Sequence, residues 1–240
     1  MKAFEFFSAK RQQFAQRAQA AFAQYKEAKK QRGMTLLEVI IVLGIIGTIA
    51  AGVVVLAQRA FDSRTISEVV QNTNTIRVAI KDAYASSGSY PQGDSSKVLA
   101  YTASTIANNT DTNATTTLVK LGKVSGEEMR NKISGDYYGI TAGHTSGENK
   151  KGYVVEVNGL TTEQCRSIIS QVGNNWDYVK VVADAAGSYT NLTNAGILMT
   201  EEVGTNVLKS LASNDVITPE KTVATCTNPG ATNAILLGSR

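Results

Sequence analysis

Apolar residues first fill a long stretch near the start of the chain and then narrow to one helical stripe. From Val39 to Ala57 the sequence contains nineteen consecutive residues without a charge. In a helix, such a run would be about 28 Å long, close to the hydrocarbon thickness of a bilayer. Beyond it, mainly apolar residues follow spacings of four and three positions: Val69, Thr73, Ile76, Ile80 and Ala83. Because no proline occurs between Met34 and Pro91, the pattern predicts one helix of about 50 residues with an apolar first half and an amphipathic second half.

The rest of the chain mixes strand-like and helix-like patterns. Three segments alternate as strands, residues 152–160, 176–184 and 233–238. Residues 161–173 carry an N-terminal cap signal and an apolar face, which together predict a helix. Residues 102–117 are rich in Thr and Asn and are interpreted as a solvated loop, and helix-like patterning resumes over residues 116–131. We therefore predict an α+β fold in which the long helix packs on an antiparallel β-sheet with short helices.

Charge divides the chain at Gly33. Residues 1–33 carry eight Lys or Arg and two acids, so the net charge of +4 on the whole chain leaves −2 on residues 34–240. This basic excess before the apolar run places the N-terminus in the cytoplasm and the larger part of the chain outside it. A signal peptide is the competing interpretation, but its apolar region is shorter and no small-residue cleavage site follows Ala57. The basic leader itself could be a partner helix, a helix on the inner membrane face, or a segment that is simply removed.

Several classes of function lack support in this sequence. No basic patch interleaved with aromatic residues remains after Gly33, which argues against nucleic-acid binding. The one histidine, His144, lies in a polar loop bounded by glycines and is expected to be exposed. Glu127 and Glu128 are adjacent, so on a helix they would point in different directions and form a solvated face. No phosphate-binding loop or nucleophile motif occurs, so we expect no catalytic residue, metal or cofactor.

Two cysteines, Cys165 and Cys226, both lie in the part expected to be exported. An even pair in an oxidising compartment indicates a disulfide, although two buried free thiols are the alternative. The bond would close a loop of about 60 residues and stabilise the fold by roughly 4 kcal/mol.

Glu38 is the single carboxylate at the start of the apolar run. A charged group inside a spanning segment costs several kcal/mol unless it is neutral or paired, which makes it a candidate functional residue. It lies four residues after Met34 and could instead extend toward the lipid head groups. If the chain were cut after Gly33, the new amine of Met34 in a neighbouring copy would be a partner. Such a buried pair would set the register between two copies more than the strength of their contact.

The segment G-MTLLEVIIVLGIIGTIAAG resembles the processing site and helix of type IV pilins. The long leader and the Met after the cut are similar to the type IVb subclass. The stretches LVKLGKVSGEEMRN and GLTTEQCRSIISQVG resemble toxin-coregulated, longus-type and colonisation-factor III pilins, including the first cysteine of the family's disulfide. The resemblance implies cleavage between Gly33 and Met34 and N-methylation of Met34. Unlike the type IVa pattern the helix has no proline, so its glycines could mark local melting or close helix packing, or ordinary membrane helix contacts: Gly44, Gly47 and Gly52.

From this resemblance we expect the precursor of a major pilus subunit, which waits in the inner membrane and polymerises into an extracellular filament for adherence, colonisation and aggregation. The implied partners are other copies of the chain, a prepilin peptidase and methyltransferase, an inner-membrane assembly platform with its ATPase, a minor pilin, an outer-membrane secretin and the host cell surface. The alternatives are a pseudopilin of a secretion apparatus, whose leader is usually short, and a signal-anchored periplasmic enzyme or binding domain. We expect five divisions of the chain: a leader that is removed (1–33), a transmembrane or filament-core half-helix (34–57), an amphipathic half-helix of the head (58–87), a loop region with a short helix (88–152), and a β-sheet and disulfide-closed C-terminal region (153–240).

Overall fold

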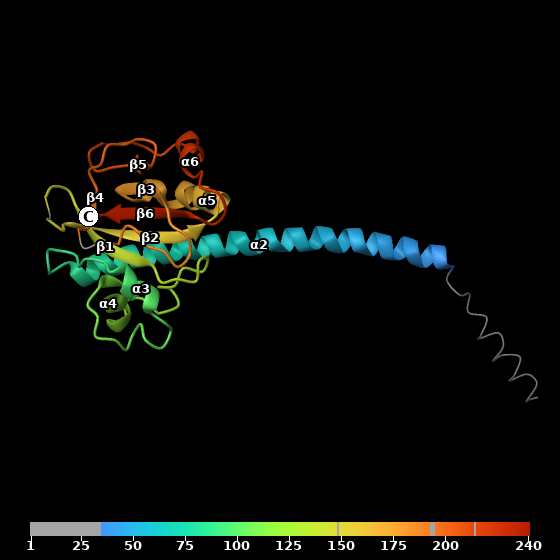
Figure 1. Ribbon diagram of the computed structural model, residues 1–240, viewed down its shortest axis with the longest axis horizontal. Coiled ribbons are helices and arrows are strands. Elements are labelled where there is room, and N and C mark those ends of the chain that lie inside the picture. The colour runs from blue at the N-terminus through green and yellow to red at the C-terminus, as the bar shows by residue number, and fades with distance from the viewer. Residues whose placement is uncertain (1–34, 148, 193–194, 214) are drawn as a thin grey trace, which may run out of the picture. The chain divides into compact units, whose positions relative to one another are not determined.

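The computed structural model describes residues 35–147, 149–192, 195–213 and 215–240 (Figure 1). The leader and the cleavage position at Gly33 and Met34 therefore lie outside the described residues. The chain divides into two compact units, residues 1–58 and 59–240, of which the second is the α+β head.

The long helix expected from the sequence is present. Helix α2 spans Leu36–Tyr84, 49 residues, and passes through the division between the two units. Within the head it buries one stripe: Ile66, Val69, Asn72, Thr73, Ile76, Ala79 and Ile80. Four of the five residues named for this stripe are buried, and the fifth, Ala83, is half-buried in the last turn.

Six strands form one sheet in the order β4-β1-β2-β6-β3-β5. Their bounds are Gly139–His144 for β1, Gly152–Leu160 for β2, Tyr178–Ala183 for β3, Ile197–Leu198 for β4, Val207–Lys209 for β5 and Asn233–Ser239 for β6. The three predicted strands are confirmed as β2, β3 and β6, and β6 lies between the other two (Figure 1). The sheet is mixed and not wholly antiparallel as expected, because β4 pairs parallel to β1.

Short helices surround the sheet: α3 Ser95–Ala100, α4 Ala114–Lys120, α5 Thr162–Val172, the 3₁₀ turn η1 Gly173–Asn175, and α6 Pro219–Thr225. The cap signal predicted before α5 is a complete capping box. The Thr161 hydroxyl accepts from the backbone of Gln164 and the Gln164 side chain accepts from the backbone of Thr161. Because both donors are satisfied, the helix start is fixed where its apolar face meets the core.

The prediction of a solvated loop over residues 102–117 was confirmed for residues 102–112, which lie outside helices and strands and are mainly exposed, and was wrong for residues 113–117. Ile106, Thr115 and Thr116 are buried, and helix α4 begins at Ala114. The two buried threonine hydroxyls keep hydrogen-bond partners. The Thr116 hydroxyl donates to the carbonyl of Ile106 at 2.5 Å, and the Thr115 hydroxyl donates to the carbonyl of Tyr138 at 2.9 Å. The helix expected over 116–131 also ends early, at Lys120.

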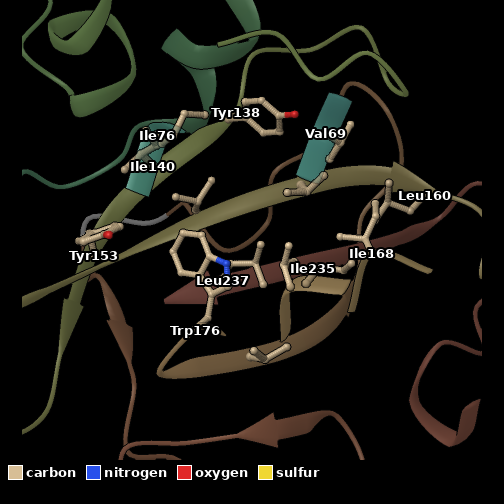
Figure 2. Close-up of a cluster of buried hydrophobic side chains, with 14 of the residues drawn as sticks. Val69, Ile76, Tyr138, Ile140, Tyr153, Leu160, Ile168, Trp176, Ile235 and Leu237 are labelled. Atoms are coloured by element: carbon tan, nitrogen blue, oxygen red, sulfur yellow. The ribbon is translucent and has the colours of Figure 1, made fainter. Parts of the chain in front are cut away.

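The sheet is covered on both faces. Its inner face and α2 enclose the main core, where Val69 and Ile76 lie near Tyr153, Ile235 and Leu237 (Figure 2). The outer face carries a second, smaller core: Val154, Tyr178, Ile197, Met199, Val207 and Leu236. A Cβ at Gly143, Gly152 or Gly238 would lie within 3 Å of the Met199 side chain. These three glycines therefore let the segment around Met199 approach the strands closely.

Candidate assembly site

Glu38 lies in the first turn of α2. The backbone nitrogen of Glu38 donates to the hydroxyl of Thr35 at 3.3 Å, and the next amide, that of Val39, donates to the carbonyl of Thr35 at 3.2 Å. Thr35 therefore caps the helix, and Glu38 occupies the position where a capping box places Glu or Gln. Sequence reasoning missed this local role, although the T-x-x-E spacing that signals it was present. Glu38 is therefore the third residue of a capped helix start, in addition to any role of its charge.

No residue in the described part of the chain covers the apolar half of α2. Its large hydrophobic side chains from Leu36 to Leu56 are between 36% and 79% exposed. The most apolar stretch of α2 has a mean hydropathy of 2.9, and none of it is buried. A continuous apolar surface of this size is unfavourable in water, so this half-helix requires lipid or other copies of the chain around it.

Gly44, Gly47 and Gly52 lie on this exposed half-helix, which remains α-helical through all three positions. A Cβ at any of them would meet nothing within 4 Å. No contact within the described part of the chain therefore requires a glycine there, and a requirement would have to come from the surroundings of the helix.

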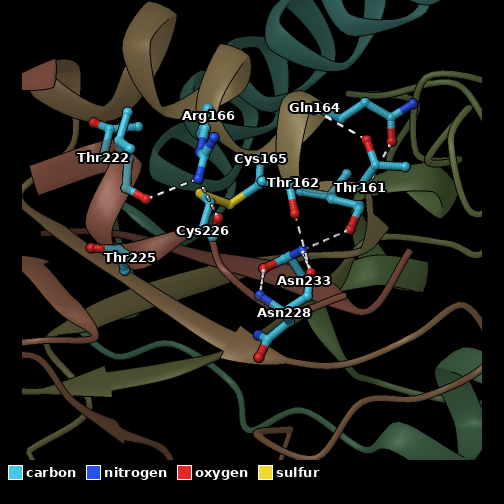
Figure 3. Close-up of a disulfide and its surroundings, with 12 residues drawn as sticks. Thr161, Thr162, Gln164, Cys165, Arg166, Thr222, Thr225, Cys226, Asn228 and Asn233 are labelled. Carbon is cyan, nitrogen blue, oxygen red and sulfur yellow. Dashed lines mark hydrogen bonds between the residues drawn. A yellow bond between two sulfur atoms is a disulfide. The ribbon is translucent and has the colours of Figure 1, made fainter. Parts of the chain in front are cut away.

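Cys165 and Cys226 form a disulfide with their Cα atoms 6.0 Å apart and 61 positions apart in the sequence (Figure 3). Cys165 belongs to α5 and Cys226 directly follows α6. Arg166 strengthens the junction, because its guanidinium donates to the carbonyls of Val223 at 3.0 Å and Cys226 at 3.2 Å. The disulfide therefore ties α6 and the approach to β6 onto α5.

The remaining candidate residues form no reactive site. His144 is half-buried at the end of β1 and not in an exposed loop as expected, because β1 extends through Gly143 to His144. Glu127 and Glu128 lie in a turn and not on a helix. Glu127 pairs with Lys132, and Glu128 accepts from the Ser125 hydroxyl, a hydrogen bond that lowers the pKa of Glu128. Within the described ranges, no group of three or more His, Cys, Asp or Glu could hold a metal ion.

Comparison with known proteins identifies the family. Residues 117–236 match the family described as toxin-coregulated pilus subunit TcpA. The toxin coregulated pilin of Vibrio cholerae serotype O1 is 38% identical over 189 residues, which cover 76% of each chain. The chain belongs to the toxin-coregulated pilin family. It is a type IVb pilin, as its resemblance to that family implied.

Further matches agree with this assignment of the pilin. A second Vibrio cholerae toxin coregulated pilin is 38% identical over 183 residues, again 76% of each chain. The crystal structure of TcpA, a type IV pilin from the Vibrio cholerae El Tor biotype, has a TM-score of 0.58 at 25% identity and covers 74% of this chain and 99% of that one. Residues 28–54 of the pilin also match the prokaryotic N-terminal methylation motif. The expected α+β pilin fold is confirmed, and an anchored enzyme or binding domain is not favoured.

Proposed function

We propose that this pilin is the precursor of the major subunit of a type IVb pilus used for adherence, host colonisation and bacterial aggregation. The observation that carries the proposal is the uncovered apolar half-helix with one acid in its first turn, on a chain of the pilin family. In a polymer, the half-helices of neighbouring copies would cover one another and remove this apolar surface from water and lipid.

Processing at Gly33 and Met34 prepares the chain for that assembly. The match to the methylation motif over residues 28–54 supports cleavage by a prepilin peptidase followed by methylation of Met34. The precursor lies in the inner membrane with its leader in the cytoplasm and its head in the periplasm, and the mature form lies in the extracellular pilus. An assembly platform with its ATPase, a minor pilin and an outer-membrane secretin complete the pathway, and the pilus then meets the host cell surface.

Glu38 is the registration charge in this proposal. Cleavage creates an amine at Met34 close to the carboxylate along the same helix, and Glu38 of one copy neutralises that amine in the next. An unpaired charge in the apolar filament core is costly, so copies slide until the pair forms. Gly44, Gly47 and Gly52 permit close approach or local melting of the half-helices in the fibre.

We expect the mature N-terminus to be N-methylated Met34. Intact-mass measurement of pilin from sheared filaments should give a chain that lacks residues 1–33 and carries one methyl group. A filament mass that retains the leader would contradict the cleavage.

Deletion of this gene should remove pili from the cell surface, as seen by electron microscopy, and its return should restore them. The protein recovered from sheared pili should consist mainly of this pilin, because a major subunit forms the fibre. Recovery of abundant pili from the deletion strain would contradict the proposal.

A further inference from the structure

Two carboxyl groups meet in the buried outer layer of the head. Glu156 lies in the middle of β2 with no exposed surface, and Asp184 directly follows β3 and is 2% exposed. Glu156 lies on the outer face of the sheet. It follows Val154 by two positions and pairs with Leu236 on β6, and both of these residues belong to the smaller core on that face. Among the residues that the structure describes, no base forms an ion pair with either acid. Two unpaired carboxylates in such a place would repel each other strongly.

Asp184 organises the loop that follows it, residues 184–192. Its carboxylate accepts from the hydroxyl of Ser188 at 3.0 Å, the amide and hydroxyl of Thr190 at 3.1 and 2.8 Å, and the side-chain amide of Asn191 at 3.2 Å. The side chain of Asn158 on β2 also donates to the carbonyls of Ala185 and Ser188. The loop is therefore built around an ionised Asp184.

Glu156 has the opposite environment. Neither of its carboxyl oxygens has a well-formed hydrogen bond from any donor group in the described residues, and its neighbour is the carboxyl of Asp184. Two carboxyls can bond only through a proton, and Asp184 already accepts from four donors, so the proton belongs on Glu156. Burial, and then Asp184, raise the pKa of Glu156 well above its usual value, against a smaller effect of Asn191. Burial opposes ionisation of Asp184, but hydrogen bonds from Glu156, Thr190 and Ser188 outweigh it and lower the pKa of Asp184.

Other titratable groups nearby do not compensate a second negative charge. Asp136 is itself an acid and accepts from the amide of Gly187 at 2.7 Å. Tyr189 is buried in the same loop, and Tyr138 is buried nearby, and burial raises the pKa of both phenols. Lys180 lies on β3, where it pairs with Glu201 at 2.7 Å. Ionisation of Glu156 would therefore add an uncompensated charge beneath the loop.

The loop also covers the sheet at this point. Gly139 pairs with Glu156 across β1 and β2, and a Cβ at Gly139 would collide with the side chain of Leu192. Leu192 thus lies over the strand pair that carries Glu156. Repulsion between Glu156 and Asp184 would therefore weaken the contact between the 184–192 loop and these strands.

We propose that Glu156 and Asp184 share one proton and that loss of this proton, as pH rises, loosens the 184–192 loop from the outer face of the sheet. The folded state holds the Glu156 proton more tightly than the unfolded chain, which releases it near about pH 4.3. The contribution of the pair is therefore complete below that pH and is lost as pH rises through the higher pKa of the folded state. The step is a simple proton release to water.

Amide hydrogen exchange on the full-length processed pilin in detergent tests this, with rates corrected for the intrinsic effect of pH. Between about pH 5 and about pH 9, protection of peptides in the 184–192 loop should fall at least roughly tenfold, the effect of one pKa unit. Glu156→Gln keeps the size of the side chain without the charge. In this variant, protection of the 184–192 loop should vary less than about twofold over the same pH range. Glu202→Gln makes the same change at an exposed position three residues after Met199 and should behave as wild type.

Unchanged protection in wild type, or an equal fall in Glu156→Gln, would overturn the proposal. If Glu156→Gln does not fold, infrared difference spectra of the wild-type protein provide the second measurement. They should show a protonated carboxyl at about pH 5 that disappears by about pH 9. Absence of that band would mean that the pair does not hold the proton, and the proposal would fail.

Discussion

Glu38→Gln should eliminate surface filaments while the cleaved pilin accumulates in the inner membrane. Gln is also favoured at the third position of a capped helix, so the hydrogen bond between Thr35 and the backbone of residue 38 can remain. Loss of the charge should even ease membrane insertion. An incoming copy would have to bury the Met34 amine without its partner, at a cost of roughly 3–5 kcal/mol, which weakens its addition by about two to three orders of magnitude or more.

The measurement is paired: immunoblotting of the membrane fraction for cleaved pilin, and recovery of filaments after shearing. Glu68→Gln is the matched control on the same helix. Glu68 forms an exposed pair with Arg64 at 3.0 Å, which contributes less than about 1 kcal/mol, so filaments should form normally. Normal filament yield from Glu38→Gln would remove the support for registration. Loss of cleavage would assign the residue to recognition by the peptidase.

Cys226→Ser should lower the amount of pilin severalfold. The disulfide closes a loop of 61 positions, and loss of such a bond destabilises a fold by roughly 4 kcal/mol. That is a large fraction of the roughly 5–15 kcal/mol that stabilises a typical domain, so more of the head would unfold and be degraded. Pulse-chase labelling of the pilin in the presence and absence of periplasmic proteases should show the faster loss.

The second cysteine supplies the control. Cys165→Ser should have a similar effect, and the double variant should be little worse than either single variant because all three lack the same bond. Wild-type abundance of Cys226→Ser would contradict a stabilising role. A double variant far less stable than both single variants would show that the cysteines act separately.

The sequence predicted elements whose local pattern agrees with their final environment. The spacing of Val69, Thr73, Ile76 and Ile80 specified the buried face of α2, and the cap signal at Thr161 specified the start of α5. Glu38 could likewise be singled out from the sequence, because an acid beside an apolar run is costly and is seldom kept there without a function.

Elements that depend on a distant segment were missed. Strand β1 was not recognised because Gly139 and Gly143 replace the bulky residues of a strand, and their reason is the approach of Leu192 and Met199. Alternation along residues 152–160 predicted strand β2 but not its surroundings, because all nine residues are buried where a second layer covers them. The meeting of Glu156 with Asp184 follows only from that layer.

The strand order constrains when the head can complete its sheet during the proposed export. Strands β2 and β3 are joined only through β6, which follows both of them in the sequence. In the proposed export, the sheet would remain as two separate parts with open edges until Asn233–Ser239 had crossed the membrane, and Cys226 would only just have become available to Cys165. The unpaired edges of β2 and β3 are then open to proteases and to pairing with other chains. If the head is exported as proposed, translocation must run almost to completion before the whole sheet can form, and the edges of β2 and β3 stay open until β6 pairs with them.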